Sequence, residues 1–304
     1  MIKVSVVIPV YNDPSGLQDT LESLVAQNFP KDQYEIIVVD NGSTDKTLDV
    51  AKMHADKYPQ LVKYVIEDNI QSSYAARNKG IIVAKGELIS FIDADMTVRE
   101  EWLIKIQSIF KDEDPDYLGC KVRVYAKNKS IASLYNVLHG FDVKSSMSNL
   151  HYAPTCCLTV KKKVFDKEGY FDSRLKSGGD TEYGERVWNT GSYKFYYAEN
   201  IFMYHPSRDK LSKLVRKTIR IGRDGRGMVS CLYPERYSWI NKLYLNYHRY
   251  LPENPLLIRK KYRCGYSFKV STTIKLSILP MILHYISALA FLWAKLQYFM
   301  NRVH

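Results

Sequence analysis

Residues 4–10 read "VSVVIPV", and this run of mostly β-branched side chains decides the fold. A strand without alternation of apolar and polar residues is typical of a parallel sheet that is covered on both faces. Behind it, after a cluster of turn-forming residues, leucine and valine side chains recur at helical spacing over residues 17–25. The opening of the chain therefore predicts a buried strand followed by a helix that packs on the sheet.

The same unit recurs along the first third of the chain. Further strand patterns occur at 34–40 ("YEIIVVD"), 61–67 ("LVKYVIE") and 87–95 ("ELISFIDAD"), with helical patterns between them. Four strand–helix repeats predict an α/β fold, with a mostly parallel sheet and helices on both of its faces. In such sheets ligands bind at the carboxyl ends of the strands.

Polar residues lie just beyond the ends of three of these strands. They are Asn12, Asp40 and the pair Asp93 and Asp95. The pair falls within "FIDADM" (91–96), which holds no basic residue to neutralise it, and in extended chain both carboxylates would point to one side. A strand that ends in carboxylates usually serves a positively charged ligand. Because a lone D-x-D triplet also occurs as a solvated turn, the shared position at one sheet edge carries more weight.

The middle of the chain is less regular, and it shows no internal repeat. Strand, helix, strand–helix–turn, helix and strand patterns follow one another at 117–126, 130–143, 156–172, 178–191 and 193–206. The fourth of these looks like a loop that opens a helix ended by Gly191.

Composition and charge set limits on the class of protein. Apolar residues make up 46% of the 304 residues and charged residues 25%, which is typical of a globular chain. The formal net charge is +12, and no acidic residue follows Glu253, while eight Lys and Arg residues do. This basic C-terminal region predicts contact with an anionic surface such as membrane lipid, nucleic acid or phosphate.

The cysteines and the N-terminus bear on the compartment. The five cysteines include no C-x-x-C pair, which favours free thiols in a reducing cytosol. The N-terminal apolar run is too short for a signal peptide and continues directly into strand pattern. We therefore expect a cytoplasmic protein, peripheral or anchored through its C-terminal region at the cytosolic face of the membrane.

The C-terminal region contains an uncharged stretch, Leu276–Ala294, bracketed by Lys275 and Lys295. Its length is about the minimum for a membrane span, and Pro280 would kink the helix. A narrow polar stripe also suits a helix that lies in the membrane interface. The stripe consists of Ser277, Pro280, His284 and Ser287. Lying in the interface, spanning the bilayer and packing on the catalytic domain all remain open, and the tyrosines of 233–266 suit either an interface or acceptor sugars.

Four ordered stretches resemble the family 2 glycosyltransferases, whose nucleotide-binding fold is called GT-A. They are "VSVVIPVYND" (4–13), "YEIIVVDNGSTDKT" (34–47), "AARNKGI" with "AKGELISFIDAD" (75–95) and "SGGDTEYGERVWNTG" (177–191). The resemblance covers roughly residues 3 to 205. It implies transfer of a sugar from a nucleotide-sugar to an acceptor hydroxyl, with inversion at the anomeric carbon.

The resemblance also implies a donor site at the strand ends. It places Asp93 near the ribose and Asp95 on a Mn²⁺ or Mg²⁺ ion that binds the diphosphate, and a late histidine, His205, would complete the metal shell or contact phosphate. The nucleotide-sugar would further meet Pro9, Tyr11, Asp40 and Arg77. Packing of Tyr11, a turn role for Asp40, a surface salt bridge of Arg77 and a structural role for His205 are the alternatives.

The family places its general base in a Glu-Asp pair at a loop-to-helix junction, and Asp180 takes the aspartate position here. Gly179 replaces the glutamate, which is a departure from the family pattern. A helix cap is the alternative role for Asp180, and Glu182 is the reserve candidate for the base. A second departure is Cys157, where many relatives carry an asparagine that meets the donor sugar.

Further contacts to the diphosphate or the acceptor are predicted from basic residues. Arg208 follows the last strand pattern, and Arg220 lies in the glycine-containing basic stretch 213–227. Such donors could stabilise the departing diphosphate, although a solvated basic helix or a membrane-facing patch fits this stretch equally.

We therefore expect a catalytic domain at 1–230 and a basic, tyrosine-rich, membrane-associating helical region at 231–304. The expected partners are a nucleotide-sugar, with UDP as its nucleotide, a carbohydrate or lipid-linked acceptor of surface polysaccharide or glycolipid synthesis, and an anionic membrane. A nucleotidyltransferase that makes nucleotide-sugars is an alternative, but "PVYNDPSG" (9–16) is not its usual Gly-rich basic loop. A non-catalytic basic binding module is another. No nucleic-acid partner is expected, because the acidic strand ends would repel a phosphate backbone.

Overall fold

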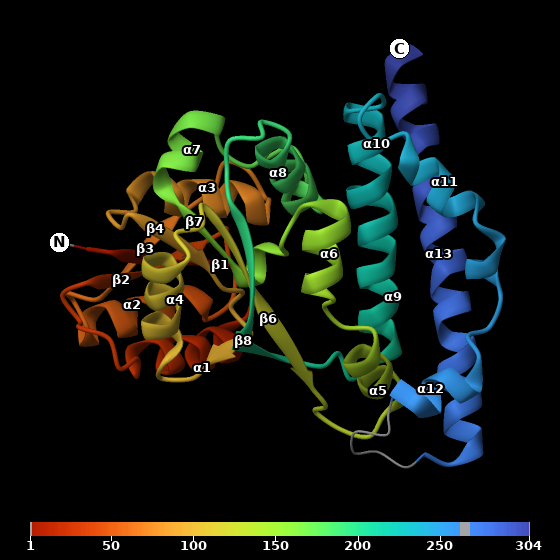
Figure 1. Cartoon of the computed structure of the whole chain (residues 1–304), viewed down its shortest axis with the longest axis horizontal. Helices are drawn as coiled ribbons and strands as arrows, with labels where there is room; N and C mark the ends of the chain where they lie inside the picture. Colours follow the sequence, from red (N-terminus) through yellow and green to blue (C-terminus); the bar gives the residue numbers. More distant parts are fainter. Residues whose placement is uncertain (1, 262–267, 304) are drawn as a thin grey trace. The chain divides into compact units, whose positions relative to one another are not determined.

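A computed structural model describes residues 2–261 and 268–303 of the chain (Figure 1). Residues 262–267, part of the basic and tyrosine-rich segment, lie outside the described residues. The chain forms two compact units, each described by itself below. The first comprises Met1–Arg123, Phe141–Arg174 and Gly179–His205, and the second Val124–Gly140, Leu175–Gly178 and Pro206–His304. The two units are defined by which residues pack together, and this does not test where a catalytic domain ends. The expected catalytic domain at 1–230 therefore stays a prediction.

A mixed sheet in the order β3-β2-β1-β4-β7-β6-β8-β5 forms the core of the first unit. One half is parallel, as expected, and its strands are β1 (Val4–Val10), β2 (Tyr34–Asp40), β3 (Val62–Ile66) and β4 (Leu88–Phe91). Strands β1 and β2 are buried along almost their whole length, in agreement with their unbroken apolar runs. Strand β4 ends at Phe91, before the two aspartates.

The strand pairs described in the other half of the sheet are antiparallel. The strand–helix repeats predicted a mostly parallel sheet, and the sheet is instead mixed. The strands of this half are β7 (Leu158–Lys161), β6 (Tyr117–Tyr125), β8 (Phe195–Pro206) and β5 (Thr97–Val98). Strand β7 pairs antiparallel with both β4 and β6, and β5 pairs antiparallel with β8. Hydrophobic pattern identifies β6, β7 and β8 but not the two-residue β5, and it does not give the direction of any of them.

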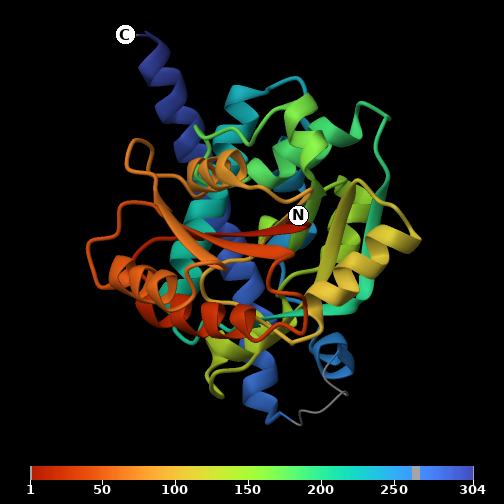
Figure 2. The same ribbon diagram turned by 90° about the vertical axis from the view of Figure 1, so that its left-hand side faces the viewer.

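Helices cover both faces of this sheet (Figure 2). They are α1 (Pro14–Val25), α2 (Thr47–Lys57), α3 (Ser73–Val83), α4 (Trp102–Asp112), α6 (Val143–Leu150), α7 (Lys162–Glu168) and α8 (Gly179–Trp188), with the 3₁₀ turn η1 (Thr155–Cys157). At the start of α1 the Asp13 side chain accepts a hydrogen bond from the Gly16 amide, and Pro14 stands at the first helical position. The leucines predicted to face the sheet are buried.

The second unit is helical. Its elements are α5 (Ile131–Leu138), α9 (Leu211–Arg220), the π-helix η2 (Ile221–Gly227), α10 (Met228–Leu232), α11 (Trp239–Leu245), the 3₁₀ helix η3 (Tyr247–Tyr250), α12 (Pro255–Lys261) and α13 (Val270–Val303). Helix α13 extends beyond the expected stretch at both ends and runs through Pro280. It packs beside α9 and η2 (Figure 1). A Cβ on Gly222 would lie 2.5 Å from the Ser287 carbonyl oxygen, so this contact requires glycine.

Among the described residues, one helix is long and apolar enough to cross a membrane. It is Val270–Asn301, with a mean hydropathy of 1.8 in its most apolar window. Of that window, 39% is buried inside the chain, so length and composition alone do not separate a span from a packed helix.

Candidate active site

The strand register brings the predicted donor residues to one edge of the sheet. Val10 lies opposite Asp40, so β1 and β2 end at the same level. After β4 ends at Phe91, the Ile92 amide donates to the Val7 carbonyl of β1 (3.3 Å). This bond keeps the chain beside β1 as it approaches the same edge. The carboxyl ends of the three parallel strands therefore meet as the sequence predicted.

Asp40 is buried and its two carboxylate oxygens differ. Oδ2 accepts from the Ser43 amide (3.0 Å), which stabilises the turn after β2. Oδ1 is buried and has no hydrogen-bond partner in the described part of the chain. A buried acceptor of this kind fits a ligand N–H or O–H.

Two of the other predicted donor contacts lie on β1 or next to it. Tyr11 follows β1, and 51% of its surface is exposed, so its ring is open to stacking. Pro9 lies within β1 opposite Val39 and is half-buried.

A polar loop beside Asp40 was not found by sequence reasoning. The buried Asn41 side chain donates to the carbonyls of Glu67 (2.7 Å) and Ile70 (2.9 Å). Gln71 in turn donates to the Asn41 carbonyl (2.9 Å). These bonds fix residues 67–71 next to the end of β2. The polar residues of "NGST" and "EDNIQ" were the available signal, but turn composition gives no pairing.

Asp93 and Asp95 do not lie in extended chain, which was the basis for expecting their carboxylates on one side. They lie in a turn that the Met96 amide closes on the Asp93 carbonyl (3.1 Å). Arg77 Nη2 lies 2.6 Å from Asp93 Oδ1, and the Arg77 side chain is only 5% exposed. Arg77, on helix α3, therefore neutralises Asp93. The segment "FIDADM" itself holds no basic residue, but the fold brings one to Asp93 from elsewhere in the chain.

Asp95 instead faces His205, which β8 brings to this edge. His205 Nε2 lies 3.7 Å from Asp95 Oδ2. The His205 side chain is buried and contacts the ring of Phe141, while that of Asp95 is 39% exposed.

These two residues fit a divalent cation that is shared with a substrate. Within residues 2–261 and 268–303, no group of three or more His, Cys, Asp or Glu side chains is arranged to hold a metal by itself. Mg²⁺ and Mn²⁺ in nucleotide enzymes often take one or two protein ligands and fill the remaining positions with phosphate oxygens and water. The pair Asp95 and His205 would supply two such protein ligands.

Asp180 lies in the first turn of α8, where Tyr74 and Thr181 contact it. Its Oδ1 accepts from the Thr181 amide (3.0 Å) and lies 3.3 Å from the Tyr74 hydroxyl. Burial raises the pKa of the Asp180 carboxyl, and the positive charge of Arg77 opposes this rise. A carboxyl with a raised pKa in a polar site is suited to proton transfer.

Helix α3 connects the Asp93 end of the site with Asp180. Tyr74 and Arg77 are one turn apart on this helix, and the Arg77 guanidinium lies 5.6 Å from the centre of the Tyr74 ring. Arg77 forms a hydrogen bond with Asp93, and Tyr74 forms one with Asp180. The two acidic residues therefore belong to one connected polar network within the first unit.

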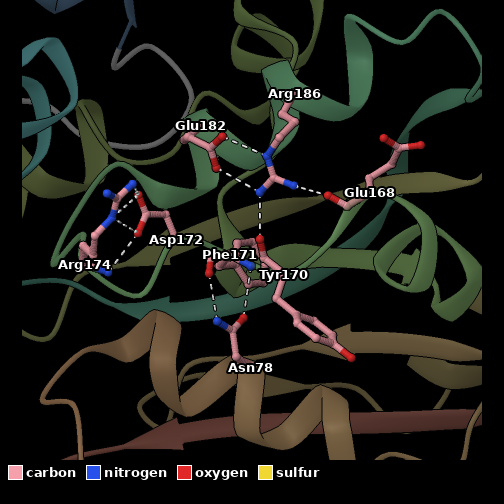
Figure 3. Close-up of polar contacts among 8 residues, drawn as sticks. All are labelled: Asn78, Glu168, Tyr170, Phe171, Asp172, Arg174, Glu182 and Arg186. Carbon is pink, nitrogen blue, oxygen red and sulfur yellow. Dashed lines mark hydrogen bonds and ion pairs between the residues drawn. The ribbon is translucent and has the colours of Figure 1, made fainter. Parts of the chain in front are cut away.

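Glu182, the reserve candidate for the base, has a different environment (Figure 3). It is buried, and its two carboxylate oxygens accept from Arg186 Nε (2.9 Å) and Nη2 (3.0 Å). Arg186 also donates to the carbonyls of Glu168 and Tyr170. This geometry favours a structural role for Glu182, which stabilises the loop after α7.

The same loop is held at two further points (Figure 3). The Asn78 side chain donates to the Phe171 carbonyl (2.8 Å) and accepts from the Phe171 amide (3.1 Å). Asp172 forms an ion pair with Arg174 (2.8 Å). Because Asn78 lies on α3, this loop and the helix that carries Tyr74 and Arg77 are fixed to each other.

The remaining predicted contacts lie elsewhere. Cys157 is buried, and its thiol donates to the Pro154 carbonyl (3.3 Å), so its contact with a sugar stays a prediction. Arg208 and Arg220 belong to the second unit. The Arg208 amide donates to Asn136 (2.8 Å), and Arg220 is an exposed residue at the end of α9. Their contact with a diphosphate also stays a prediction.

Comparison with known proteins identifies the family. Residues 5–169 match the family model described as Glycosyl transferase family 2. The chain belongs to glycosyl transferase family 2. The resemblance seen in the sequence is thereby confirmed, and the protein is a glycosyltransferase.

Curated relatives agree with this assignment. Glycosyltransferase AglE of Haloferax volcanii is 35% identical over 72% of this chain and 72% of its own. A dolichyl N-acetyl-alpha-D-glucosaminyl phosphate 3-beta-D-2,3-diacetamido-2,3-dideoxy-beta-D-glucuronosyltransferase of Methanococcus voltae is 27% identical over 72% and 71%. The poly(ribitol-phosphate) beta-glucosyltransferase of Bacillus spizizenii is 42% identical, but over 38% of this chain and 18% of its own.

Solved structures show the same GT-A fold. The mannosyltransferase PcManGT of Pyrobaculum calidifontis, in complex with GDP-Man and Mn²⁺, has a TM-score of 0.62 and 20% identity, over 96% of this chain and 88% of its own. S. aureus TarS 1-349 in complex with UDP-GlcNAc has a TM-score of 0.57 and 18% identity, over 99% and 92%. At these identities the likeness concerns the fold alone.

Proposed function

We propose that this glycosyltransferase moves a sugar from a nucleoside diphosphate sugar to an acceptor hydroxyl, with inversion, and that Asp180 is the general base. The observation that carries the proposal is the network from Asp93 through Arg77 and Tyr74 to Asp180. It sets one carboxylate at the donor edge of the sheet and a second, with a raised pKa, at the start of α8.

The nucleoside would bind at the ends of β1 and β2. Asp40 Oδ1, buried and without a partner among the described residues, would accept a hydrogen bond from the base or ribose, and Tyr11 would stack on the base. We propose a UDP-sugar. One structural neighbour binds UDP-GlcNAc and another GDP-Man, so a donor panel must include both nucleosides.

Asp95 and His205 would hold Mn²⁺ or Mg²⁺ together with the diphosphate. When bound, the ion supplies positive charge beside the leaving group. The protein groups of this region hold the acidic turn in place, since Arg77 fixes Asp93 and β8 fixes His205.

Asp180 would act on the acceptor. Its Oδ1 is occupied by the Thr181 amide and the Tyr74 hydroxyl, which leaves Oδ2 for the acceptor hydroxyl. As the acceptor oxygen bonds to the anomeric carbon, its proton passes to Asp180. The diphosphate leaves with the electron pair of the broken carbon–oxygen bond, on the opposite face of the sugar.

Helix α13 supports a site of action at the membrane, because its outer face as well as its inner face is largely apolar. Three of its hydroxyl-bearing residues are buried, namely Thr273, Ser277 and Ser287. Its outer face exposes large apolar side chains: Val270, Ile274, Ile282, Tyr285, Leu289, Leu292, Trp293, Leu296, Phe299 and Met300. A helix in water normally exposes its polar face, so this surface is suited to lipid.

The packing of α13 favours a position in the membrane interface over a span. Its inner face bonds to neighbouring helices, as where the Tyr244 hydroxyl meets the Ser287 hydroxyl (2.8 Å). It packs along α9, which carries several basic residues. A spanning α13 would take those charges into the bilayer, at a high cost in free energy. Exposed Lys269 and Lys275 would meet anionic headgroups.

We further propose that the acceptor is a lipid-linked sugar or polyprenyl carrier used in surface polysaccharide or glycolipid synthesis. The Methanococcus voltae relative is named for transfer to a dolichyl-linked sugar phosphate. Membership in the family argues against the two alternatives from the sequence, the nucleotidyltransferase and the non-catalytic binding module.

A panel of UDP-glucose, UDP-GlcNAc and GDP-mannose with Mn²⁺ tests the donor site, by thermal shift and by release of free nucleotide. We expect a UDP-sugar to raise the melting temperature and to be turned over. Asp95→Ala should lose the part of the stabilisation that depends on Mn²⁺, because one of its two protein ligands is removed. If no donor is bound or turned over by the wild type, the proposal is wrong.

A further inference from the structure

Gly179 and the Tyr74 ring are complementary in shape. A Cβ at position 179 would lie 2.8–2.9 Å from three atoms of that ring, closer than side-chain carbons approach in proteins. Gly179 stands where the family pattern has a glutamate, so the space next to the base is occupied here by an aromatic ring from another helix.

The Tyr74 hydroxyl contacts Asp180 twice. It accepts a hydrogen bond from the Asp180 amide (3.3 Å) and donates one to Asp180 Oδ1 (3.3 Å). A single hydroxyl thereby joins the main chain and side chain of one residue, which limits rotation of the carboxylate. Together with the Thr181 amide, it occupies Oδ1 and keeps Oδ2 as the reactive oxygen.

Tyr74 is itself firmly held. It is 5% exposed, and its ring contacts that of Phe171 at 5.7 Å between centres. Its amide donates to the Ser72 hydroxyl (3.3 Å) at the start of α3. Burial raises the pKa of Tyr74, so the hydroxyl stays protonated and acts as a donor.

Within residues 2–261 and 268–303, few charged or titratable groups besides Tyr74 act on Asp180. From α3, the Arg77 guanidinium favours its ionised form. From β6, Tyr117 interacts with it, but that hydroxyl is bonded to the main chain of Ala153 (3.0 Å) and is neutral. Among the described side chains, the Tyr74 hydrogen bond and the Arg77 charge are therefore the two influences that favour the carboxylate.

We propose that Tyr74 is a positioning residue for Asp180, and that glycine at 179 is required to admit its ring. The Tyr74 hydroxyl orients the carboxylate and stabilises its ionised form. This inference rests on the proposed function, in which Asp180 is the base.

The test uses the full chain and the panel donor that the wild type turns over, with water as the acceptor and release of free nucleotide as the signal. In Tyr74→Phe we expect kcat to fall about 5- to 10-fold, as for loss of one hydrogen bond to a charged group. KM for the donor should not change. The base works when ionised, so activity is lost as the pH falls. Without the Tyr74 donor this acid limb should move to higher pH.

Two further variants separate this role from a general effect on packing. Tyr34→Phe removes another buried tyrosine hydroxyl, which bonds the Leu24 carbonyl (2.9 Å), and should leave the acid limb in place. Gly179→Ala should move the limb in the same direction as Tyr74→Phe, because the added methyl displaces the ring.

The outcomes are distinct. An acid limb that stays in place in both Tyr74→Phe and Gly179→Ala, with kcat near that of the wild type, overturns the inference but leaves the proposed function intact. No nucleotide release by the wild type from any donor overturns the proposed function, and this inference with it. A fall in kcat without movement of the limb shows that Tyr74 acts only through packing and also overturns the inference.

Discussion

Asp40 shows how one carboxylate serves both the fold and a ligand. Its Oδ2 stabilises the turn after β2, while its buried Oδ1 has no partner among the described residues. An unpaired buried acceptor costs about 1–3 kcal/mol, which a donor group on a ligand would recover. The turn role and the ligand role that the sequence left as alternatives are therefore compatible.

Asp40→Asn should weaken nucleotide binding about 10- to 100-fold, because its amide cannot replace the charged acceptor fully and can present N–H groups to a ligand N–H. Its amide oxygen can still accept from the Ser43 amide, so the melting temperature should change little. Titration calorimetry with UDP and with GDP measures the effect.

The matched control is Asp19→Asn, an exposed aspartate on α1. It should bind nucleotide as the wild type does. Equal affinity in Asp40→Asn and the control would mean that Asp40 serves the turn alone.

At the scale of elements, strands β1 and β2 of the parallel half of the sheet were predictable because they are covered on both faces. The runs at 4–10 and 34–40 match β1 and β2 in full. Such strands carry a strong apolar signal in a single stretch of sequence. The prediction for 87–95 was too long, since the chain leaves the sheet after Phe91 to form the acidic turn.

Other elements could not be predicted, for physical reasons. Helix α6 reads "VKSSMSNL", and its three serines have low helix propensity. It forms because the Asp142 side chain caps it and Val143 and Met147 are buried. The direction of β7 depends on its pairing with the distant β4 rather than on its own residues.

Helix α13 gives a prediction about an element. Leu289→Gln with Leu292→Gln should lower binding to anionic vesicles roughly 10- to 100-fold, because both side chains lie on the apolar outer face. The free energy of unfolding should change by less than about 0.5 kcal/mol, since neither is packed inside. Vesicle flotation and thermal melting measure the two effects.

The control variant replaces two exposed apolar residues of the first unit by glutamine. Ile82→Gln with Ile104→Gln changes two exposed apolar side chains on α3 and α4 and should leave flotation unaltered. If the α13 variant floats with vesicles as well as the control does, the outer face of α13 is not a lipid surface.

At the scale of the whole molecule, sequence reasoning named the candidate residues but not their partners. The motifs indicated Asp93, Asp95 and Asp180, because each lies next to a recognisable strand or helix end. The pairing of Asp93 with Arg77, and the approach of His205 to Asp95, depend on α3 and β8 reaching the same edge. Contacts between segments far apart in the chain have no signature in one sequence.

The central claim is that segments at the end of β4, on α3 and at the start of α8 form one active site. The most direct measurement compares Asp180→Asn with the wild type, in donor binding and in release of nucleotide. The account predicts donor affinity within about twofold of the wild type and turnover lower by at least about 100-fold, since loss of a general base costs this much. Turnover by Asp180→Asn at the wild-type rate would contradict it.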